Sequence, residues 1–426
     1  MIRNPILDEV RNNVDSRPIP WKGLNRANIV TEDEVQSFES LGKLTPPERL
    51  EQVRKDAPRY AGIVAQILSK DGREDLVKYL VLFIAEYSST VPAFADSLVG
   101  IDEVWHCLAK MLTRGDEQIA TLAAASLAAL TKTKLNEETS TAFFDYVVDT
   151  LLCAGSDEID QKDLGAQLLA TVLQNNASRV PFRKYEQRAV PELGRLALTA
   201  PLQLQYSSLL VLWILSFDKH AGNRYLNQFN IVPTLLDVAQ RGVKEKIVRL
   251  CIATLANLVR LIPQAAIPVI IAEGAMTNGK VLPDRKWNDE ELQSDLDYLN
   301  TTLVEAFDSM TTFEEYLAEL QAHKLRWSPV HRNRAFWMEN IDEFCKDDWA
   351  VLKRLVALAL QSKDNVTLAV ACHDIAAIVH QNSDAVQVIS RAGGKVRIME
   401  LIGDSDNDVR YEALRASQVM LQHILA

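Results

Sequence analysis

The chain has 426 residues, in which 57 aspartates and glutamates outnumber 46 lysines and arginines to give a formal net charge of −11. This acidic balance argues against a general binder of nucleic acids or anionic membranes, because contacts to phosphates require clustered lysine and arginine, but it leaves room for a local basic patch. With only 16 glycines and 15 prolines, the chain is poor in the residues that form turns between strands, so its composition favours helices.

Residues 1–45 are polar, and they lack the apolar segment of a signal peptide. No stretch of the chain approaches the ~18 apolar residues that cross a membrane. The five cysteines are isolated, which predicts neither a zinc site nor a disulfide framework. "LTPPERL" predicts a helix that begins at Pro46, with Thr45 and Glu48 as its capping box. We therefore expect a soluble, intracellular, all-α protein.

A helical repeat recurs along the chain. An apolar helix, a short polar break and a second helix rich in alanine and leucine make up residues 100–132, and residues 229–259 and 392–421 repeat this plan. The intervals leave room for further units of roughly 40 residues, the period of HEAT and armadillo repeats. Because one helix pair cannot bury its apolar face alone, neighbouring pairs are expected to stack into an armadillo/HEAT-like solenoid.

"GAMTNGKV" (Gly274 to Val281) fits the spacing G-x-x-x-x-G-K of a phosphate-binding loop and follows the strand-like "IPVIIAE". Such a loop needs Ser or Thr after the lysine to hold magnesium, and then a helix. Here Val281 follows Lys280, and Pro283 comes next. The pattern therefore favours a turn over a nucleotide site.

The acidic segment from Asp284 to Leu320 interrupts the repeats. It carries eleven acids against Arg285 and Lys286, yet its apolar residues keep helical spacing, which predicts a solvated acidic helix rather than disorder. We expect it to link two solenoids. The predicted domains are residues 1–283 (N-terminal solenoid), 284–323 (linker helix) and 324–426 (C-terminal solenoid).

"KLRWSPVHRNRAFWMENI" (Lys324 to Ile341) combines two tryptophans, a phenylalanine and three arginines. Ser328 and Pro329 predict a helix start, and the aromatic residues are expected to pack on the next helix, "DDWAVLKRLVALAL". Arginine and tryptophan are also frequent anchors of protein interfaces. The sequence leaves both readings open, with a docking face that would comprise Arg332, Arg334 and Trp337.

"VACHDIAAIV" places Cys372, His373 and Asp374 side by side. Consecutive residues of a helix point about 100° apart, so these three cannot form a catalytic triad. Cys372 instead shares an apolar stripe with Leu368 and Ile375, typical of a core face. We predict no catalytic residue, no metal site and no cofactor.

"LRWSPVHRNRAFWMENIDEF" resembles the segment that joins the two domains in the family of V-type proton ATPase H subunits. Five further stretches are similar to the family in the same order, and residues 1–200 follow its plan mainly in helical rhythm. These stretches are Leu202–Phe217, Tyr225–Leu258, Phe313–Leu320, Leu368–Val379 and Gly393–Gln418.

The resemblance implies a regulatory subunit without catalysis, at the cytosolic face of vacuolar, lysosomal or endosomal membranes. In this family the N-terminal solenoid grips a peripheral stalk and the C-terminal domain contacts the large membrane-sector subunit, which couples ATP hydrolysis to proton transport. After the sectors separate, a loop of the C-terminal domain inhibits the detached soluble sector. By position, this short loop corresponds to Gln361, Ser362, Lys363, Asp364 and Asn365.

The alternative is a free-standing armadillo-type adaptor that carries basic peptides, which the acidic charge would suit. Carriers of that kind line their groove with repeated W-x-x-x-N motifs. The tryptophans of the repeats lack asparagine four residues later, and the W-x-x-x-N at Trp21 and Asn25 lies outside the repeats. This absence favours the ATPase subunit.

Overall fold

The computed structural model describes residues 2–70, 72–130, 136–155, 158–273, 281–282, 285–309 and 311–425. Within these ranges the regular elements are α-helices and one π-helical segment, with no strand. The predicted all-α, helical-repeat class is confirmed. The chain divides into two compact units, described separately below: an N-terminal unit (Met1–Ile262 with Trp287–Leu292) and a C-terminal unit (Pro263–Lys286 with Gln293–Ala426).

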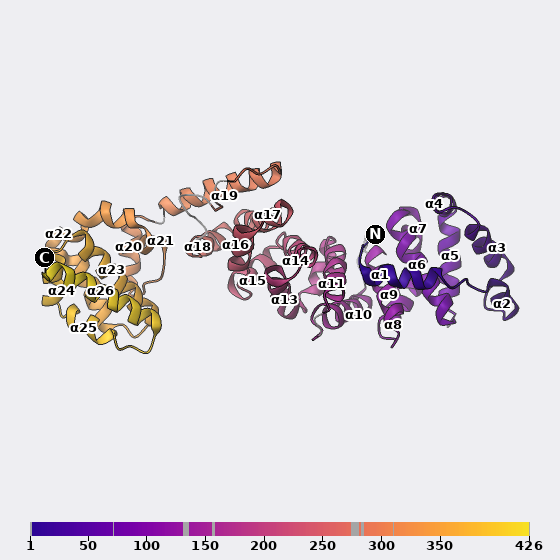
Figure 1. The fold of residues 1–426 in the computed structure, drawn as a ribbon, viewed down its shortest axis with the longest axis horizontal. Helices are drawn as coiled ribbons and strands as arrows, with labels where there is room; N and C mark the ends of the chain where they lie inside the picture. Colours follow the sequence, from indigo (N-terminus) through magenta and orange to yellow (C-terminus); the bar gives the residue numbers. More distant parts are fainter. Residues whose placement is uncertain are drawn as a thin grey trace. The chain divides into compact units, whose positions relative to one another are not determined.

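The N-terminal unit is a two-layer stack of helices (Figure 1). Its elements are α1 (Pro5–Asp15), α2 (Trp21–Arg26), α3 (Glu32–Gly42), α4 (Pro46–Lys55), α5 (Ala57–Leu68), α6 (Glu74–Thr90), α7 (Pro92–Val99), α8 (Asp102–Leu112), α9 (Glu117–Leu130), α10 (Glu137–Phe144), η1 (Asp145–Leu152), α11 (Ile159–Val172), α12 (Asn176–Phe182), α13 (Glu186–Thr199), α14 (Leu202–Leu215), α15 (Lys219–Asn227), α16 (Ile231–Arg241) and α17 (Glu245–Leu261).

One layer, layer A, consists of α6, α9, α11, α14 and α17, each packed against the next. The other, layer B, consists of α5, α8, α10 with η1, α13 and α16, which pack in the same successive way. The predicted modules at residues 100–132 and 229–259 are the helix pairs α8–α9 and α16–α17. Buried alanines of α9, such as Ala123 and Ala124, have small side chains, which allows close packing of neighbouring helices. This repeated pairing buries most of the apolar side chains of the helices in the two layers.

The first helix, α1, crosses layer A and contacts α6, α9 and α11. Its N-cap residue, Asn4, is buried and donates Nδ2 to the carbonyl oxygen of Asp160 at 2.8 Å. At its other side, Arg11 pairs with Glu86 of α6 at 2.8 Å. α1 therefore joins helices that are far apart in the sequence.

The capping box predicted at α4 is confirmed. The Glu48 carboxylate accepts hydrogen bonds from the backbone nitrogen and the hydroxyl of Thr45, both at 2.8 Å, and the helix begins at Pro46. The apolar run before the glycine-rich motif is not a strand as the sequence suggested, because Pro263–Ala272 forms α18. Most of that motif, residues 274–280, lies outside the described residues.

The acidic segment forms two helices instead of one. Helix α19 (Glu290–Ser309) begins in the N-terminal unit and continues in the C-terminal unit, and α20 (Phe313–Gln321) follows it. The predicted apolar stripe of α19 is buried at Leu292, Leu296, Leu299 and Leu303, so only the acidic side of this helix is solvated. Whether residues 284–323 act as a linker remains a prediction.

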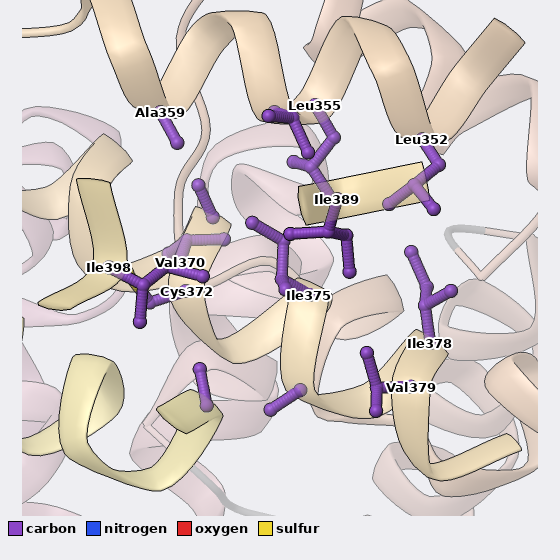
Figure 2. Packing of buried hydrophobic residues seen from close by; sticks show 14 of the residues in the cluster. Leu352, Leu355, Ala359, Val370, Cys372, Ile375, Ile378, Val379, Ile389 and Ile398 are labelled. Carbon is purple, nitrogen blue, oxygen red and sulfur yellow. The ribbon is translucent and has the colours of Figure 1, made fainter. Parts of the chain in front are cut away.

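The C-terminal unit continues with α21 (Pro329–Arg332), α22 (Arg334–Gln361), α23 (Asn365–Gln381), α24 (Ala385–Arg391), α25 (Gly394–Leu401) and α26 (Asn407–Leu425). Helix α23 packs between α22 and α26. Figure 2 shows Leu355 of α22, Ile375 of α23 and Ile389 of α24 meeting in this core. The predicted stripe containing Cys372 is buried as expected.

Helix α22 is kinked where the sequence predicts one helix to end and "DDWAVLKRLVALAL" to begin. Three consecutive residues adopt left-handed backbone angles, with φ of 51° at Asp347, 53° at Asp348 and 61° at Trp349. Aspartate tolerates this region better than most residues, but a run of three left-handed residues is costly. The partly buried Trp349 side chain packs against the core next to the kink, which helps to hold this conformation.

Candidate functional site

The predicted inhibitory loop lies between two buried helices of the C-terminal unit. Gln361 ends α22 and Asn365 begins α23, so residues 362–364 form the connection. Gln361, Lys363, Asp364 and Asn365 are exposed, and the Ser362 side chain is half-buried. This exposure makes the loop available to a partner.

Asp364 has a second role as the N-cap of α23. Its Oδ2 accepts hydrogen bonds from the Thr367 hydroxyl at 2.7 Å and from the Thr367 backbone nitrogen at 2.9 Å. These two bonds lower the pKa of the Asp364 carboxyl. Asn365 in turn donates Nδ2 to Asp406 at 3.2 Å, which ties the loop to the turn between α25 and α26. The loop is therefore not freely replaceable at all five positions.

Two exposed apolar side chains flank the loop. Leu360 precedes it with 42% of its surface exposed, and Val366 follows it with 46% exposed. The prediction from sequence named only the polar residues. An isolated exposed leucine or valine is ordinary, but a pair beside a candidate contact loop supplies apolar area to an interface.

Of the three residues predicted to form a docking face, only the arginines lie at the surface. Arg332 stacks over the Trp327 ring at 5.5 Å and donates Nη1 to the carbonyl oxygen of Ala272 at the end of α18, at 2.7 Å. Arg334 is the first residue of α22 and is exposed. Arg332 is therefore committed to an internal contact, while Arg334 faces solvent.

Trp337 does not lie on the predicted face, because its side chain is only 4% exposed. Its ring packs against Tyr316, Phe336 and Phe344, with ring centroids 5.0–5.7 Å apart, and its Nε1 donates to the carbonyl oxygen of His331 at 3.2 Å. The aromatic residues of this segment thus build the core, as the packing interpretation predicted. The Ser328–Pro329 helix start is also correct, but this helix has four residues and a new helix begins at Arg334.

A buried ion pair lies beneath this segment. His331 Nδ1 is 2.8 Å from Oδ2 of Asp374 on α23, and both side chains are fully buried. His331 Nε2 is 3.2 Å from Oε2 of Glu319 on α20, and His373 Nδ1 is 3.2 Å from Oδ1 of Asp374. Sequence reasoning missed this cluster because His331 and Asp374 are 43 residues apart, and the motif around Asp374 points only to its neighbours Cys372 and His373.

The charges of the pair follow from this geometry. Burial opposes a charge on His331, but the Asp374 carboxylate and its hydrogen bond outweigh burial and raise the pKa of His331 to about 9. Burial also opposes ionisation of Asp374, but the attraction of His331 outweighs it and lowers the pKa of Asp374. At neutral pH both groups are therefore charged, and the cluster is suited to holding α20, α21 and α23 together rather than to acid–base chemistry.

In the part of the chain that the structure describes, no group of side chains is arranged for catalysis or for metal binding. Cys372 is buried, and burial raises the pKa of its thiol to about 12, which leaves no reactive thiolate. The described residues contain no group of three or more His, Cys, Asp or Glu side chains placed to hold a metal ion. Among the helices described, none combines the length and hydropathy that a membrane crossing requires.

A stack of helical repeats presents extended surfaces of the kind that repeat proteins use for binding. Two family models of the V-ATPase H subunit match the chain, one over residues 5–303 and the other over residues 309–424. The chain belongs to the V-ATPase H-subunit family.

Curated relatives agree with this assignment. The V-type proton ATPase H subunit of Drosophila melanogaster is 24% identical over 437 residues, which cover 98% of this chain and 90% of that protein. The corresponding protein of Dictyostelium discoideum is 25% identical, and the match covers 95% of this chain and 92% of that protein. One of the probable V-type proton ATPase H subunits of Caenorhabditis elegans is 34% identical over 225 residues, about half of each chain.

Proposed function

We propose that this protein is a non-catalytic regulatory subunit of a V-type proton ATPase, which bridges the peripheral stalk and the membrane sector and couples ATP hydrolysis to proton transport. The observation that carries the proposal is the pair of family matches, which together extend over both helical units. The protein would act from the cytosol as a peripheral part of the complex on vacuolar, lysosomal or endosomal membranes.

The two units are proposed to divide this work. The N-terminal solenoid would grip the peripheral stalk, and the C-terminal solenoid would contact the cytosolic part of the large membrane-sector subunit. The proposed boundaries are residues 1–283, 284–323 and 324–426. Limited proteolysis tests them: cleavage near residues 274–288 or 321–325, which are polar stretches at the ends of the acidic segment, should release fragments that stay folded by circular dichroism. A chain that resists cleavage at both places would contradict the division.

The loop of residues 361–365 is proposed to inhibit the detached soluble sector. Its exposed Lys363 and the apolar flanks Leu360 and Val366 offer a small mixed contact surface. Because Asp364 caps α23, the informative variant keeps it and changes only the loop tip, as Ser362→Gly with Lys363→Glu. This variant should leave the melting temperature unchanged.

The experiment has two steps. First, the tagged chain is purified, and the co-purifying ATPase subunits are identified; their absence would contradict the proposed function. Second, the loop-tip variant is added to the soluble sector, where it should inhibit ATP hydrolysis less than the wild type does. Arg391→Glu, an exposed charge reversal at the end of α24, is the matched control. If the loop-tip variant inhibits as strongly as the control, the contact lies elsewhere, with Arg334 the next residue to test.

A further inference from the structure

The turn between α25 and α26 carries an exposed serine in an acidic sequence. The stretch "GDSDNDVR" (Gly403 to Arg410) spans this turn and the start of α26, and its Ser405 is exposed. Asp406 and Asp408 follow the serine at the first and third positions. Protein kinases select substrates by charge pattern, and a kinase with a basic substrate groove selects acids placed shortly after the serine. Ser405 has the spacing that such a kinase recognises.

The hydroxyl of Ser405 is available for modification. The carboxylate next to it is engaged, because Asp406 Oδ1 accepts hydrogen bonds from the backbone nitrogens of Asp408 at 2.9 Å and Val409 at 3.1 Å and so caps α26. Within the described residues the Ser405 hydroxyl itself makes no hydrogen bond. Exposed turns of this kind are also where an enzyme reaches a folded chain most easily.

Other hydroxyl residues with an acid three positions later are less suitable. Thr31 and Thr45 are engaged in the capping boxes of α3 and α4. The Thr113 hydroxyl donates to the carbonyl oxygen of Lys110 at 2.9 Å. Ser294 is exposed, but it lies inside α19, where the helix must open locally before the backbone can enter an active site. Ser294 therefore serves as a control with the same spacing.

A cation lies beside Ser405. Arg410 Nη1 donates to the carbonyl oxygens of Asp404 at 2.7 Å and Ser405 at 2.9 Å, and its Nη2 contacts the side-chain oxygen of Asn407. These partners are neutral, and a guanidinium binds a phosphate more strongly because both groups are charged. Since Arg410 already reaches the backbone of Ser405, a phosphate on this serine lies within its reach. The positive end of the α26 dipole favours an anion at the same place.

The turn is joined to the loop of residues 361–365. Asp406 Oδ2 accepts a hydrogen bond from Nδ2 of Asn365 at 3.2 Å. Acids and bases nearly balance around this bond, and Glu400 is paired with Arg397 at 3.2 Å. The charged groups are Asp364, Asp404, Asp406, Asp408, Lys324, Lys363 and Arg410.

A phosphate would shift this balance. It adds about −1.5 to −2 charges at neutral pH, which makes the surface beside the loop clearly acidic. A group of the ATPase that binds the exposed Lys363 must be an anion, and a phosphate close to it would repel that anion. Phosphorylation should therefore oppose the contact that the loop is proposed to make.

We propose that Ser405 is phosphorylated by an acid-directed protein kinase, and that the phosphate, bound by Arg410, weakens inhibition by the loop of residues 361–365. In the reaction, Ser405 Oγ bonds to the γ-phosphorus of a nucleoside triphosphate while the bond from that phosphorus to the bridging oxygen breaks. The nucleoside diphosphate leaves, and the kinase takes up the hydroxyl proton. The effect on inhibition rests on the proposed function, whereas the modification site does not.

Phosphorylation is tested on the intact chain with casein kinase II, an acid-directed enzyme, and magnesium ATP. Trypsin releases residues 398–410, in which Ser405 is the only residue with a hydroxyl group, so mass spectrometry assigns a phosphate on this peptide without ambiguity. Ser405→Ala should remove the phosphate from the peptide, and Ser294→Ala should not. An unmodified peptide from the wild type would overturn the inference.

The acid at the third position is tested separately. Asp408→Asn should slow phosphorylation of Ser405 by roughly tenfold, as expected for the loss of one charged contact to the kinase. Glu400→Gln is the matched control, because it removes an exposed acid that precedes the serine, and it should change the rate little. Equal rates in these two variants would contradict recognition by the acidic pattern.

Phosphorus NMR tests the role of Arg410. Ion pairing with the guanidinium favours the doubly charged phosphate, so the second pKa of the phosphoserine should be lower in the wild type than in Arg410→Gln. The same pKa in both proteins would show that Arg410 does not bind the phosphate.

The inhibition assay separates this inference from the proposed function. After the kinase is removed, half-maximal inhibition of the soluble sector should need a roughly fivefold higher concentration of phosphorylated than of unmodified chain, the effect of losing one exposed charge contact. Kinase-treated Ser405→Ala should inhibit like the unmodified chain. Equal inhibition with and without phosphate would refute the regulation and leave the proposed function standing. If the unmodified chain does not inhibit, the proposed inhibition fails and its regulation with it.

Discussion

Removing one partner of the buried His331–Asp374 pair should destabilise the C-terminal unit strongly. Leucine has a volume similar to that of histidine, but His331→Leu leaves the fully buried carboxylate of Asp374 without its cation. Breaking such a pair from one side typically costs about 3–5 kcal/mol. The rise in the pKa of His331 from 6.5 to about 9 corresponds to a preference for the charged, folded form on the order of 3 kcal/mol. The energy expected from breaking the pair and the energy that corresponds to the pKa shift therefore agree.

The pair also predicts how stability depends on pH. Because the folded protein raises the pKa of His331 above its ordinary value of 6.5, this contribution is complete below about pH 6.5 and is lost as pH rises through about 9. The pKa of Asp374 is lowered from 3.8, so its contribution is present above that value and is lost as pH falls below it. The C-terminal unit should therefore be more stable at pH 6 than at pH 9.

Hydrogen exchange of the intact chain measures the effect locally. At pH 7, peptides from α23 should lose roughly a hundredfold of their protection in His331→Leu, the equivalent of about 3 kcal/mol. His380→Leu, at an exposed position of the same helix, is the control and should change protection little. The melting temperatures of the wild type and His331→Leu, measured from pH 6 to pH 9, should converge towards pH 9. Equal protection in the two variants, or a constant difference in melting temperature across this range, would refute the reasoning.

Three other outcomes are expected. Trp337→Ala should lower the free energy of unfolding by about 3–5 kcal/mol because it removes a buried indole. Met338→Ala, at the exposed position that follows, should change this free energy little. Urea unfolding of both variants measures the difference. Asp364→Ala should lower the stability of α23 by about 1 kcal/mol through loss of its cap, measured in the same way, and equal stability would argue against the cap. The isolated chain should hydrolyse no ATP, and Lys280→Ala should leave the activity of the assembled complex unchanged; ATPase assays check both.

The repeat architecture could be predicted because it depends on local periodicity. The pairs α8–α9, α16–α17 and α25–α26 each show an apolar stripe, a polar break and a second stripe, and no distant contact is needed to recognise them. The strand-like reading of α18 failed because a short apolar run fits a buried strand and a buried helix equally well.

The candidate site was less predictable because its parts meet only through tertiary packing. The sequence placed the loop of residues 361–365 correctly between two helices, but the bond from Asn365 to Asp406 joins residues 41 positions apart. Burial of Trp337 could be expected from its surroundings, but the pairing of His331 with Asp374 could not. Ordinary amphipathic patterns contain Val396, Met399 and Leu414, and only the folded structure shows that these side chains are exposed.

Helix α1 has a consequence for how the N-terminal unit unfolds. In a stack where each repeat touches only its neighbours, stability is nearly a sum over adjacent pairs, so one end can unravel while the other stays folded. The bond from Asn4 to Asp160 spans 156 residues, and the pair of Arg11 and Glu86 spans 75. These contacts close a large loop across layer A and raise the contact order of the unit. They convert a chain of semi-independent segments into a structure whose two halves gain stability together, at the cost of slower folding.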